Sequence, residues 1–384
     1  MAEIDIQNAI KYYEDFETEE MELNMGPQHP STHGVLRLKL KVDGETVRSV
    51  DPVIGYMHRC AEKLGEHVTW PGFVPYTDRK DYCAAMNDNL GYAVAVEKIL
   101  QCEIPERADY LRVIVAELNR IASHLLVTGV FGLDMGAFTP LLHCFREREH
   151  ILDLFDELCG ARLTYNYVRI GGVAWDAPDG WLKGVEDFLS YFDPKIAEYN
   201  QLLSENVIFI NRTANIGVLT PELAINYGCS GPFLRGSGVK WDLRRDDPYS
   251  IYDRFDFDVI VGHGEKGSVG DCWDRYIVRV REMEESVKII RQALKSIPEG
   301  PVKAKLPRVL KLPKGEAFAR TESPRGEIGY YIISDGGETA YRMRLRSPSF
   351  CNLSVIPVLG KNTMIADLVA ILGSVDIVLC DVDR

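Results

Sequence analysis

Two histidines stand in an unusual segment near the N-terminus, residues 26–34, which also holds two prolines and two glycines. Each proline fixes its own backbone and pushes the preceding residue toward an extended conformation, so we predict a rigid loop and exclude an α-helix or a regular strand. A firmly held imidazole can protonate a substrate. His29 and His33 have the i, i+4 spacing of metal ligands on a helix, but the prolines exclude that helix. A structural role for either histidine remains as consistent with this segment as a functional one.

An acidic residue and a phenol further along could also take part in proton transfer. Asp134 is the one acidic residue between positions 125 and 145. The pKa of a carboxyl group in apolar surroundings tends to be raised, as in a proton donor or relay. The alternative is that Asp134 caps a helix that restarts after the neighbouring glycines. Tyr82 follows the charged stretch 78–81, and its default interpretation is a core or surface tyrosine.

Residues 262–267 have the G-x-G-x-x-G form that binds dinucleotides in some enzymes. The segment lacks a surrounding strand–helix–strand unit, so we interpret it as a flexible loop entering a helix. Nine cysteines are scattered along the chain without any Cys-x-x-Cys pair. This pattern gives no zinc or iron–sulfur ligand spacing, and we expect no metal in this chain.

Regular elements must hold these side chains in place. Alternating apolar residues predict a hairpin with strands at 35–42 and 45–54, and a second hairpin at 326–334 and 338–346. The proline- and lysine-rich stretch 298–315 is typical of a linker. Helical periods and N-cap signals predict helices at 81–101, from 105, at about 140–159, from 193, from 220, at 273–297 and near 363–373, with 273–297 the longest.

The chain has 384 residues, of which 46% are hydrophobic and 26% are charged, and these values predict a globular protein. Its net charge of −13 arises largely from residues 1–25, which hold eight acidic side chains and one lysine. This balance argues against nucleic acid as a partner. No signal or transit pattern occurs at the N-terminus, so we expect a cytoplasmic location.

We expect an α+β fold that is mainly helical. Its predicted parts are an acidic N-terminal extension at 1–24, a β-hairpin unit with the histidine loop at 25–75, a central helix bundle at 76–300, and a C-terminal α+β segment at 301–384 packed on the bundle.

Several ordered segments together resemble a known family. They are 24–38, 54–59 with 62–64, 77–82, 117–126, 145–149, 169–173, 282–286 and 382–384. They are similar to the 49-kDa-type subunits, known in bacteria as D-type subunits, of the proton-pumping NADH–quinone oxidoreductase, complex I. The resemblance covers about residues 21–384.

This family is related to the large subunit of nickel–iron hydrogenases, whose metal is held by two Cys-x-x-Cys pairs. Here the corresponding positions resemble Arg79–Tyr82 and 376–384, and both pairs are missing. The resemblance therefore implies a hydrogenase-like helix bundle whose metal cavity has become a pocket for a quinone head. Cys60 and Cys380 stand near this region where relatives usually have glycine.

The resemblance also assigns roles to individual residues. It implies that His33 and Tyr82 are the ligands of the quinone head, with Asp134 paired to His33, and that Arg59 lies against an iron–sulfur cluster of a partner subunit. Proton chemistry agrees independently, because reduction of a quinone to a quinol requires a proton donor at each carbonyl, and an imidazole and a phenol suit that task.

The expected function is that of the quinone-site subunit of a respiratory complex. The expected partners are the 4Fe-4S small subunit of the B type, the C-type subunit and the H-type membrane subunit, and the expected place is the cytoplasmic side of the inner membrane. Three alternatives stay open: a homologous complex with another electron donor such as ferredoxin, a non-catalytic assembly scaffold, and a hydrogenase-type metalloenzyme.

Overall fold

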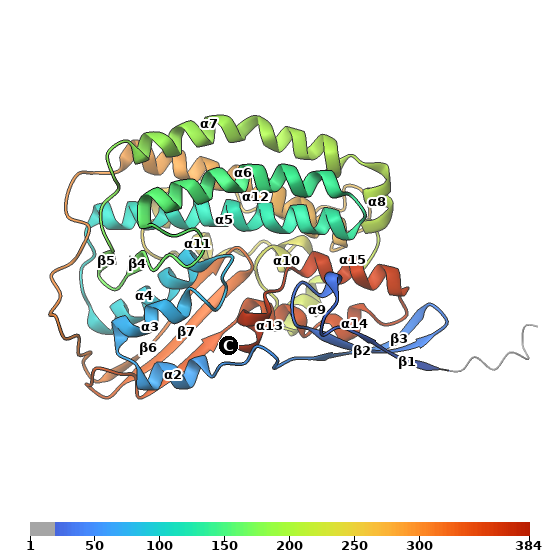
Figure 1. Ribbon diagram of the computed structural model, residues 1–384, viewed down its shortest axis with the longest axis horizontal. Coiled ribbons are helices and arrows are strands. Elements are labelled where there is room, and N and C mark those ends of the chain that lie inside the picture. The colour runs from blue at the N-terminus through green and yellow to red at the C-terminus, as the bar shows by residue number, and fades with distance from the viewer. Residues whose placement is uncertain (1–19) are drawn as a thin grey trace, which may run out of the picture.

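The computed structural model describes residues 20–384, and its helices and three small sheets confirm an α+β protein in which helices predominate. Four long helices lie side by side as a bundle (Figure 1). They are α5 (Glu106–Asp134), α6 (Phe138–Cys159), α7 (Trp181–Tyr199) and α12 (Cys272–Ser296).

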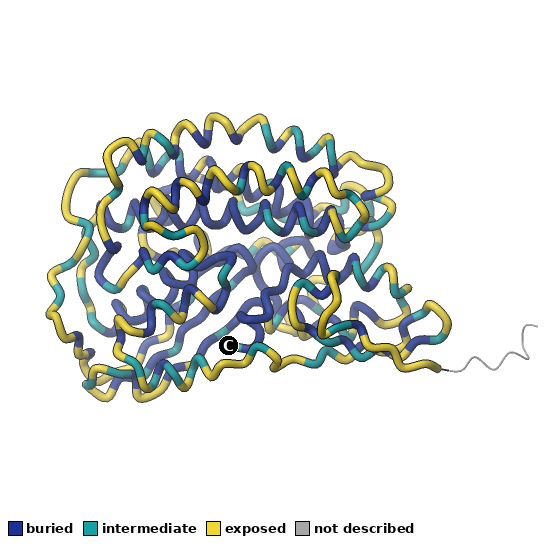
Figure 2. The backbone as a smooth tube through the Cα atoms, in the orientation of Figure 1, coloured by how far each residue is buried: buried dark blue, intermediate teal, exposed yellow. Residues whose placement is uncertain are grey.

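Helix α5 is the centre of this bundle, and Figure 2 shows it buried along nearly its whole length. By length and hydropathy it could cross a membrane, but 89% of its most apolar 18-residue window is buried inside the protein, as expected of a core helix. The expectation that 273–297 is the longest helix is wrong, because α5 has 29 residues and α12 has 25. Helix α5 continues as far as Asp134 and is buried along most of its length, and its buried side chains include charged ones such as Glu117 and Arg120.

The prediction that a helix begins at Asp193 is also wrong. Pro194 lies inside α7, which begins at Trp181 after Gly180, a residue with φ of 86°. The apolar face of α7 continues past the proline to Tyr199 with helical spacing. Packing of this face against the bundle therefore offsets the roughly 3 kcal/mol that an interior proline costs.

The N-terminal sheet contains β1 (Met21–Met25), β2 (Arg37–Asp43) and β3 (Thr46–Val53) in that order, all antiparallel. The predicted hairpin is confirmed, and its alternation places Leu38, Leu40 and Val42 in the core. Strand β1 lies across the boundary drawn from the sequence at residue 24. It was not predicted, although Met21, Leu23 and Met25 alternate with polar residues, because the strand is only five residues long and four of the five are exposed.

The C-terminal sheet has the order β6–β7–β8 and contains β6 (Gly315–Ser323), β7 (Gly326–Ser334) and β8 (Arg342–Arg346). The second hairpin is present, with a shorter final strand than predicted. Strand β6 follows the predicted linker and was missed because its sequence is rich in charged and polar residues. It is nevertheless half-buried, since one face packs on α4 (Ala85–Leu100).

Short elements connect these parts. Before the bundle they are α2 (Ala61–His67) and α3 (Trp70–Thr77); within it, β4 (Val168–Arg169), β5 (Gly172–Val173), the π-helix η2 (Asn200–Ser204), α8 (Val207–Thr213), α9 (Pro221–Asn226), α10 (Gly231–Gly236), α11 (Leu243–Asp246) and η3 (Tyr252–Arg254); after the C-terminal sheet, α13 (Pro348–Leu353), α14 (Ile356–Leu359), α15 (Ile365–Val375) and α16 (Leu379–Asp383). The division of the chain into four parts stays a prediction.

Candidate functional site

The histidine loop is held by its own hydrogen bonds. His29 caps the 3₁₀ turn η1 (Pro30–Thr32), because its Nδ1 accepts a hydrogen bond from the Ser31 N–H at 3.3 Å. The Thr32 hydroxyl donates to the His29 carbonyl at 2.8 Å. The backbone then passes through the left-handed region at His33, with φ of 51°. These hydrogen bonds hold the loop in a defined conformation, to which His29 contributes.

His33 meets Asp134 across the fold. The distance from His33 Nε2 to Asp134 Oδ2 is 2.6 Å, and the two side chains are 14% and 7% exposed. Asp134 is the last residue of α5, where the helix dipole disfavours a negative charge, and the imidazole partner offsets that effect when it is protonated. The alternative role as a helix cap is not observed, because Ala137 precedes the first turn of α6.

Two glycine contacts let the surrounding elements approach this pair. A Cβ on Gly373 of α15 would lie 2.8 Å from Asp134 Oδ2 and 2.9 Å from the Phe131 ring. Gly34 has φ of 142° and lies beside the Leu379 side chain of α16. Helix α15 therefore lies against Asp134, and the start of α16 lies against Gly34, the residue next to His33.

Tyr82 reaches the same segment of α16 from another side. Its ring packs with a small buried cluster formed by Cys83, Val378 and Cys380. Burial raises the pKa of Tyr82 to about 12, while the positive charge of Arg325 acts in the opposite direction. The phenol is therefore a proton-bearing group at neutral pH. Among the described residues, no hydrogen bond joins Tyr82 to His33 or Asp134, and the two groups approach α16 separately.

Arg59 and Tyr82 have one neighbouring residue in common, Cys380. The Nη2 of Arg59 donates to the Arg79 carbonyl at 2.8 Å, and its backbone N–H donates to the Arg384 carbonyl at 3.2 Å. A cavity of about 130 Å³ is lined by Arg59, Arg79, Arg384 and Cys380, among others. Cys380 therefore lines the cavity beside Arg59 and also belongs to the buried cluster against which Tyr82 packs.

Buried ion pairs fix the segment that carries Tyr82. Lys80 Nζ lies 2.8 Å from Asp88 and 3.3 Å from Asp381. Asp81 is paired with Arg325, whose guanidinium also reaches Asp376. We refer to these six residues as the Tyr82-side cluster: Lys80, Asp81, Asp88, Arg325, Asp376 and Asp381. Sequence reasoning missed it, although acidic residues in the apolar segment 374–384 were a signal.

A second set of buried charges lies at the centre of the protein. Glu117 accepts hydrogen bonds from Arg120 and Arg244 at 3.1 Å and from Tyr252 and Ser286 at 2.7 Å. Burial alone would raise its pKa, but the arginines and hydroxyls outweigh burial and hold the pKa at about 2. We refer to the whole set as the bundle cluster: Glu117, Arg120, Arg235, Asp242, Arg244, Glu282 and Glu322.

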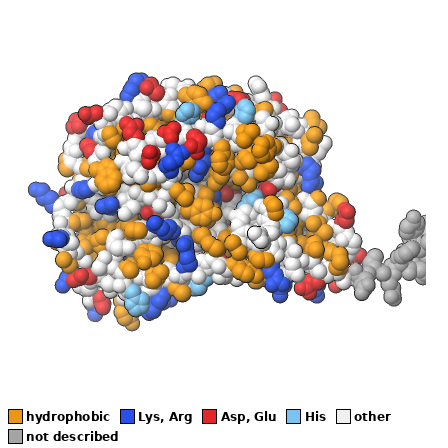
Figure 3. All heavy atoms as spheres, in the orientation of Figure 1, with side chains coloured by type: hydrophobic (Ala, Val, Ile, Leu, Met, Phe, Trp, Pro, Cys, Tyr) orange, Lys and Arg blue, Asp and Glu red, His pale blue; other side chains and the backbone are white. Residues whose placement is uncertain are grey.

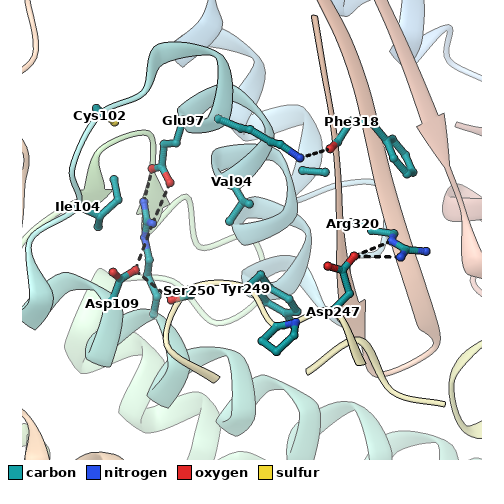
Figure 4. Close-up of a pocket in the computed structure, with 14 residues that line it drawn as sticks. Val94, Glu97, Cys102, Ile104, Asp109, Asp247, Tyr249, Ser250, Phe318 and Arg320 are labelled. Carbon is teal, nitrogen blue, oxygen red and sulfur yellow. Dashed lines mark hydrogen bonds and ion pairs between the residues drawn. The ribbon is translucent and has the colours of Figure 1, made fainter. Parts of the chain in front are cut away.

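A larger cavity lies elsewhere, beside α4 and the β6 strand, and has a volume of about 640 Å³ (Figure 4). Its charged lining is already paired, since Glu97 binds Arg112 at 2.5 Å and Asp247 binds Arg320 at 2.9 Å. Charged side chains that satisfy one another leave little to recognise a ligand. Among residues 20–384, no group of three or more histidine, cysteine or acidic side chains is arranged to hold a metal ion.

An apolar surface extends from the Asp134 end of α5. Figure 3 shows hydrophobic side chains gathered over the part of α6 that lies toward α8. Phe138, Leu142 and Phe145 lie one or two turns apart on α6 and are 57%, 55% and 36% exposed, and Leu133 is exposed beside them. Exposed apolar patches of this kind mark interaction surfaces.

Comparison with known proteins agrees with the resemblance drawn from the sequence. The chain matches the family described as "Respiratory-chain NADH dehydrogenase, 49 Kd subunit" over residues 134–311 and 308–384. It is 57% identical to the D-type subunit of NADH-quinone oxidoreductase from Bacillus cereus over 367 residues, which cover 95% of this chain and 99% of the relative. It is 55% identical to the D-type subunit from Chlorobaculum tepidum over 374 residues, which cover 96% and 94% of the two chains.

Proposed function

The chain belongs to the family of the 49-kDa subunits of respiratory-chain NADH dehydrogenase, and from this premise we propose that it binds a quinone head and supplies protons for its reduction. The observation that carries the proposal is the short contact between His33 and Asp134 on a loop that is held by its own hydrogen bonds. A carboxylate paired with an imidazole both orients the ring and stabilises its protonated form.

In this proposal His33 serves one carbonyl of the quinone. Its Nε2 is occupied by Asp134, so Nδ1 is the ring atom that is free to donate a hydrogen bond to a substrate oxygen. As negative charge develops on that oxygen during reduction, a proton moves from Nδ1 to the oxygen. The imidazole then becomes neutral and retains its hydrogen bond to the Asp134 carboxylate.

Tyr82 serves the second carbonyl. Its raised pKa keeps the phenol protonated until a strongly basic, reduced quinone oxygen takes the proton. The half-buried setting among Cys83, Val378 and Cys380 suits an apolar quinone ring, because it excludes water from the reacting oxygen.

Electrons would come from an iron–sulfur cluster in a neighbouring small subunit of the B type. Arg59 supports this arrangement, since it is exposed, is held at its backbone and side chain, and shares the Cys380 cavity with the Tyr82 region. A fixed positive charge at that position favours the reduced state of a nearby cluster.

The remaining proposals concern the setting of the protein in its complex. The apolar surface around Phe138 and Leu142 suits contact with other subunits, for which we propose the B-type, C-type and membrane H-type subunits of a proton-pumping complex. We place the chain at the cytoplasmic face of the membrane. We further propose a hydrogenase-like bundle in which the Lys80–Asp381 ion pair joins the segments that would otherwise share a metal.

The test is quinone reduction by the assembled complex. We expect His33→Ala, Asp134→Asn and Tyr82→Phe each to lower the turnover by about tenfold or more, because each removes a proton donor or its partner. Assembly, followed by the amount of intact complex, stays normal.

Two matched controls separate this effect from general damage. His67→Ala removes an exposed histidine from α2, and Tyr331→Phe removes a hydroxyl that contacts Glu316 at the surface. Both controls keep their activity. Unchanged turnover in all three site variants would instead indicate a scaffold whose pocket is unused.

A further inference from the structure

The tip of the β6–β7 hairpin is buried, although hairpin tips usually lie in solvent. All residues from 321 to 326 are buried, and Arg325 at the turn is 3% exposed. Gly326 permits this insertion, because a Cβ there would lie 2.5 Å from the Ser230 hydroxyl and its φ is 129°. A charged residue carried into the interior on a tight turn requires partners that offset its desolvation.

Arg325 finds those partners beside Tyr82. Its Nη1 lies 2.9 Å from both carboxylate oxygens of Asp81 and donates to the Ser123 hydroxyl at 3.1 Å. Its Nη2 donates to Asp376 at 3.0 Å. One guanidinium therefore clamps the residue that precedes Tyr82 to the segment that leads into α16.

The local charge balance makes this guanidinium important. The Tyr82-side cluster contains the acids Asp81, Asp88, Asp376 and Asp381, and its bases are Lys80 and Arg325, with Arg279 near Asp376. Acids outnumber bases, so a further negative charge at Tyr82 would be costly. Of these bases, Arg325 is the one that most clearly favours ionisation of the phenol.

We infer that Arg325 is a positioning residue for the proposed quinone chemistry: it holds the Tyr82 segment in place and offsets the charge that forms when the phenol gives up its proton. In that step the O–H bond of Tyr82 breaks and an O–H bond forms on the quinone oxygen. The negative charge moves from the reduced quinone to the phenolate, and solvent later restores the proton. The electrons come from the iron–sulfur partner, so this inference rests on the proposed function.

The experiment uses the assembled complex and compares Arg325→Lys with Arg325→Gln. The lysine keeps the positive charge and the glutamine removes it. We expect Arg325→Gln to lower kcat about tenfold with a small change in KM, and Arg325→Lys to retain most of the activity. Equal losses in the two variants would overturn the inference, because the charge would then not matter.

A purely structural defect needs its own control, because loss of the arginine leaves the buried Asp81 without its ion-pair partner and leaves Asp376 only the more distant Arg279. The double variant Arg325→Gln/Asp376→Asn removes one charge of each sign and should restore assembly. Its kcat stays low although the net charge is restored, because Arg325 is a main electrostatic partner of the Tyr82 phenol and Asp376 is not. Its solvent deuterium isotope effect rises because proton donation from Tyr82 becomes slower. Recovery of kcat in this variant would show that Arg325 is needed only for folding.

The last measurement tests whether the effect of Arg325 depends on the Tyr82 phenol. In a Tyr82→Phe background, Arg325→Gln should lower the remaining kcat by less than about twofold, since no phenolate forms there. A full tenfold loss in that background would overturn the inference while leaving the proposed function intact. If Tyr82→Phe alone leaves kcat unchanged, the proposed role of Tyr82 fails, and the inference about Arg325 fails with it.

Discussion

The bundle cluster and the Tyr82-side cluster are both buried networks of basic side chains and carboxylates, yet the pKa values of their acidic residues mostly shift in opposite directions. In the bundle cluster the arginines outweigh burial, and the pKa values of Glu117 and Glu282 are both about 2. Beside Tyr82 burial dominates, so the pKa of Asp81 is raised and that of Asp78, on the same segment, reaches about 6. One acid departs from the trend in each place, since the pKa of Glu322 is raised and that of Asp381 is lowered.

This difference separates a structural network from one suited to proton chemistry. Acids with a strongly lowered pKa carry a fixed charge at any physiological pH, and they join helices without exchanging protons. Acids whose pKa is raised can change protonation near neutral pH, and such groups cluster at functional sites. The second kind lies beside the proposed proton donor Tyr82, and the first lies between α5, α10 and α12, within the bundle core.

The largest effect should follow from breaking the bundle cluster. Glu117→Gln leaves Arg120 and Arg244 without their shared carboxylate in a fully buried site. We expect a loss of about 3–5 kcal/mol in the free energy of unfolding, because removing one partner strands a buried charge. The amount of assembled complex and its thermal midpoint measure this loss.

A matched surface variant calibrates that result. Glu186→Gln breaks the exposed contact between Glu186 and Lys183 on α7, for which we expect a change below about 0.5 kcal/mol. Equal effects of the two substitutions would contradict a structural role for the bundle cluster.

The sequence predicted the parts of the fold whose pattern is local. The hairpin after His33, helix α12 and the loop at 26–34 follow from alternation, helical period and proline positions. Strand β6 could not be predicted this way, since its burial comes from packing on α4 and not from an apolar alternation. The same holds for Pro194, whose place inside α7 is decided by tertiary packing.

The candidate site depends on pairings between distant residues, which no local pattern contains. His33 and Asp134 are 101 positions apart, and Asp81 and Arg325 are 244 apart. The apolar residues that surround Asp134 in the sequence indicated only that its carboxylate needed a partner. The family resemblance supplied the first pairing, while the second required the structure, because a charged hairpin tip normally lies in solvent.

An intermediate effect should follow from displacing Asp134 without changing its chemistry. In Gly373→Ala the new methyl group would lie 2.8 Å from Asp134 Oδ2, so the carboxylate must move away from His33. Alanine stabilises a helix relative to glycine, so α15 itself is not weakened. We expect turnover of quinone to fall about tenfold while assembly stays normal.

Gly315→Ala is the control for that variant, because a Cβ at Gly315 meets nothing within 4 Å and leaves activity unchanged. Normal turnover in Gly373→Ala would mean that the His33–Asp134 contact is not required for the reaction.

The smallest effect concerns Asp78, whose buried carboxylate accepts the Asn166 N–H at 3.1 Å. Burial raises its pKa from 3.8 to about 6. A group with this shift binds its proton more tightly in the folded state, so its contribution to stability is complete below pH 3.8 and is lost as the pH rises through about 6. Asp78→Asn keeps the acceptor oxygen and removes the charge.

The thermal midpoint of Asp78→Asn should therefore exceed that of the unmodified complex by an amount that grows between about pH 4 and pH 6, to about 2 °C, and is constant above. Asp187→Asn, at an exposed position on α7, should show no such growth. A difference that instead grew toward acid pH would mean that Asp78 carries a fixed charge, as Glu117 does. The contrast between the two buried clusters would then not extend to the whole segment that holds Tyr82.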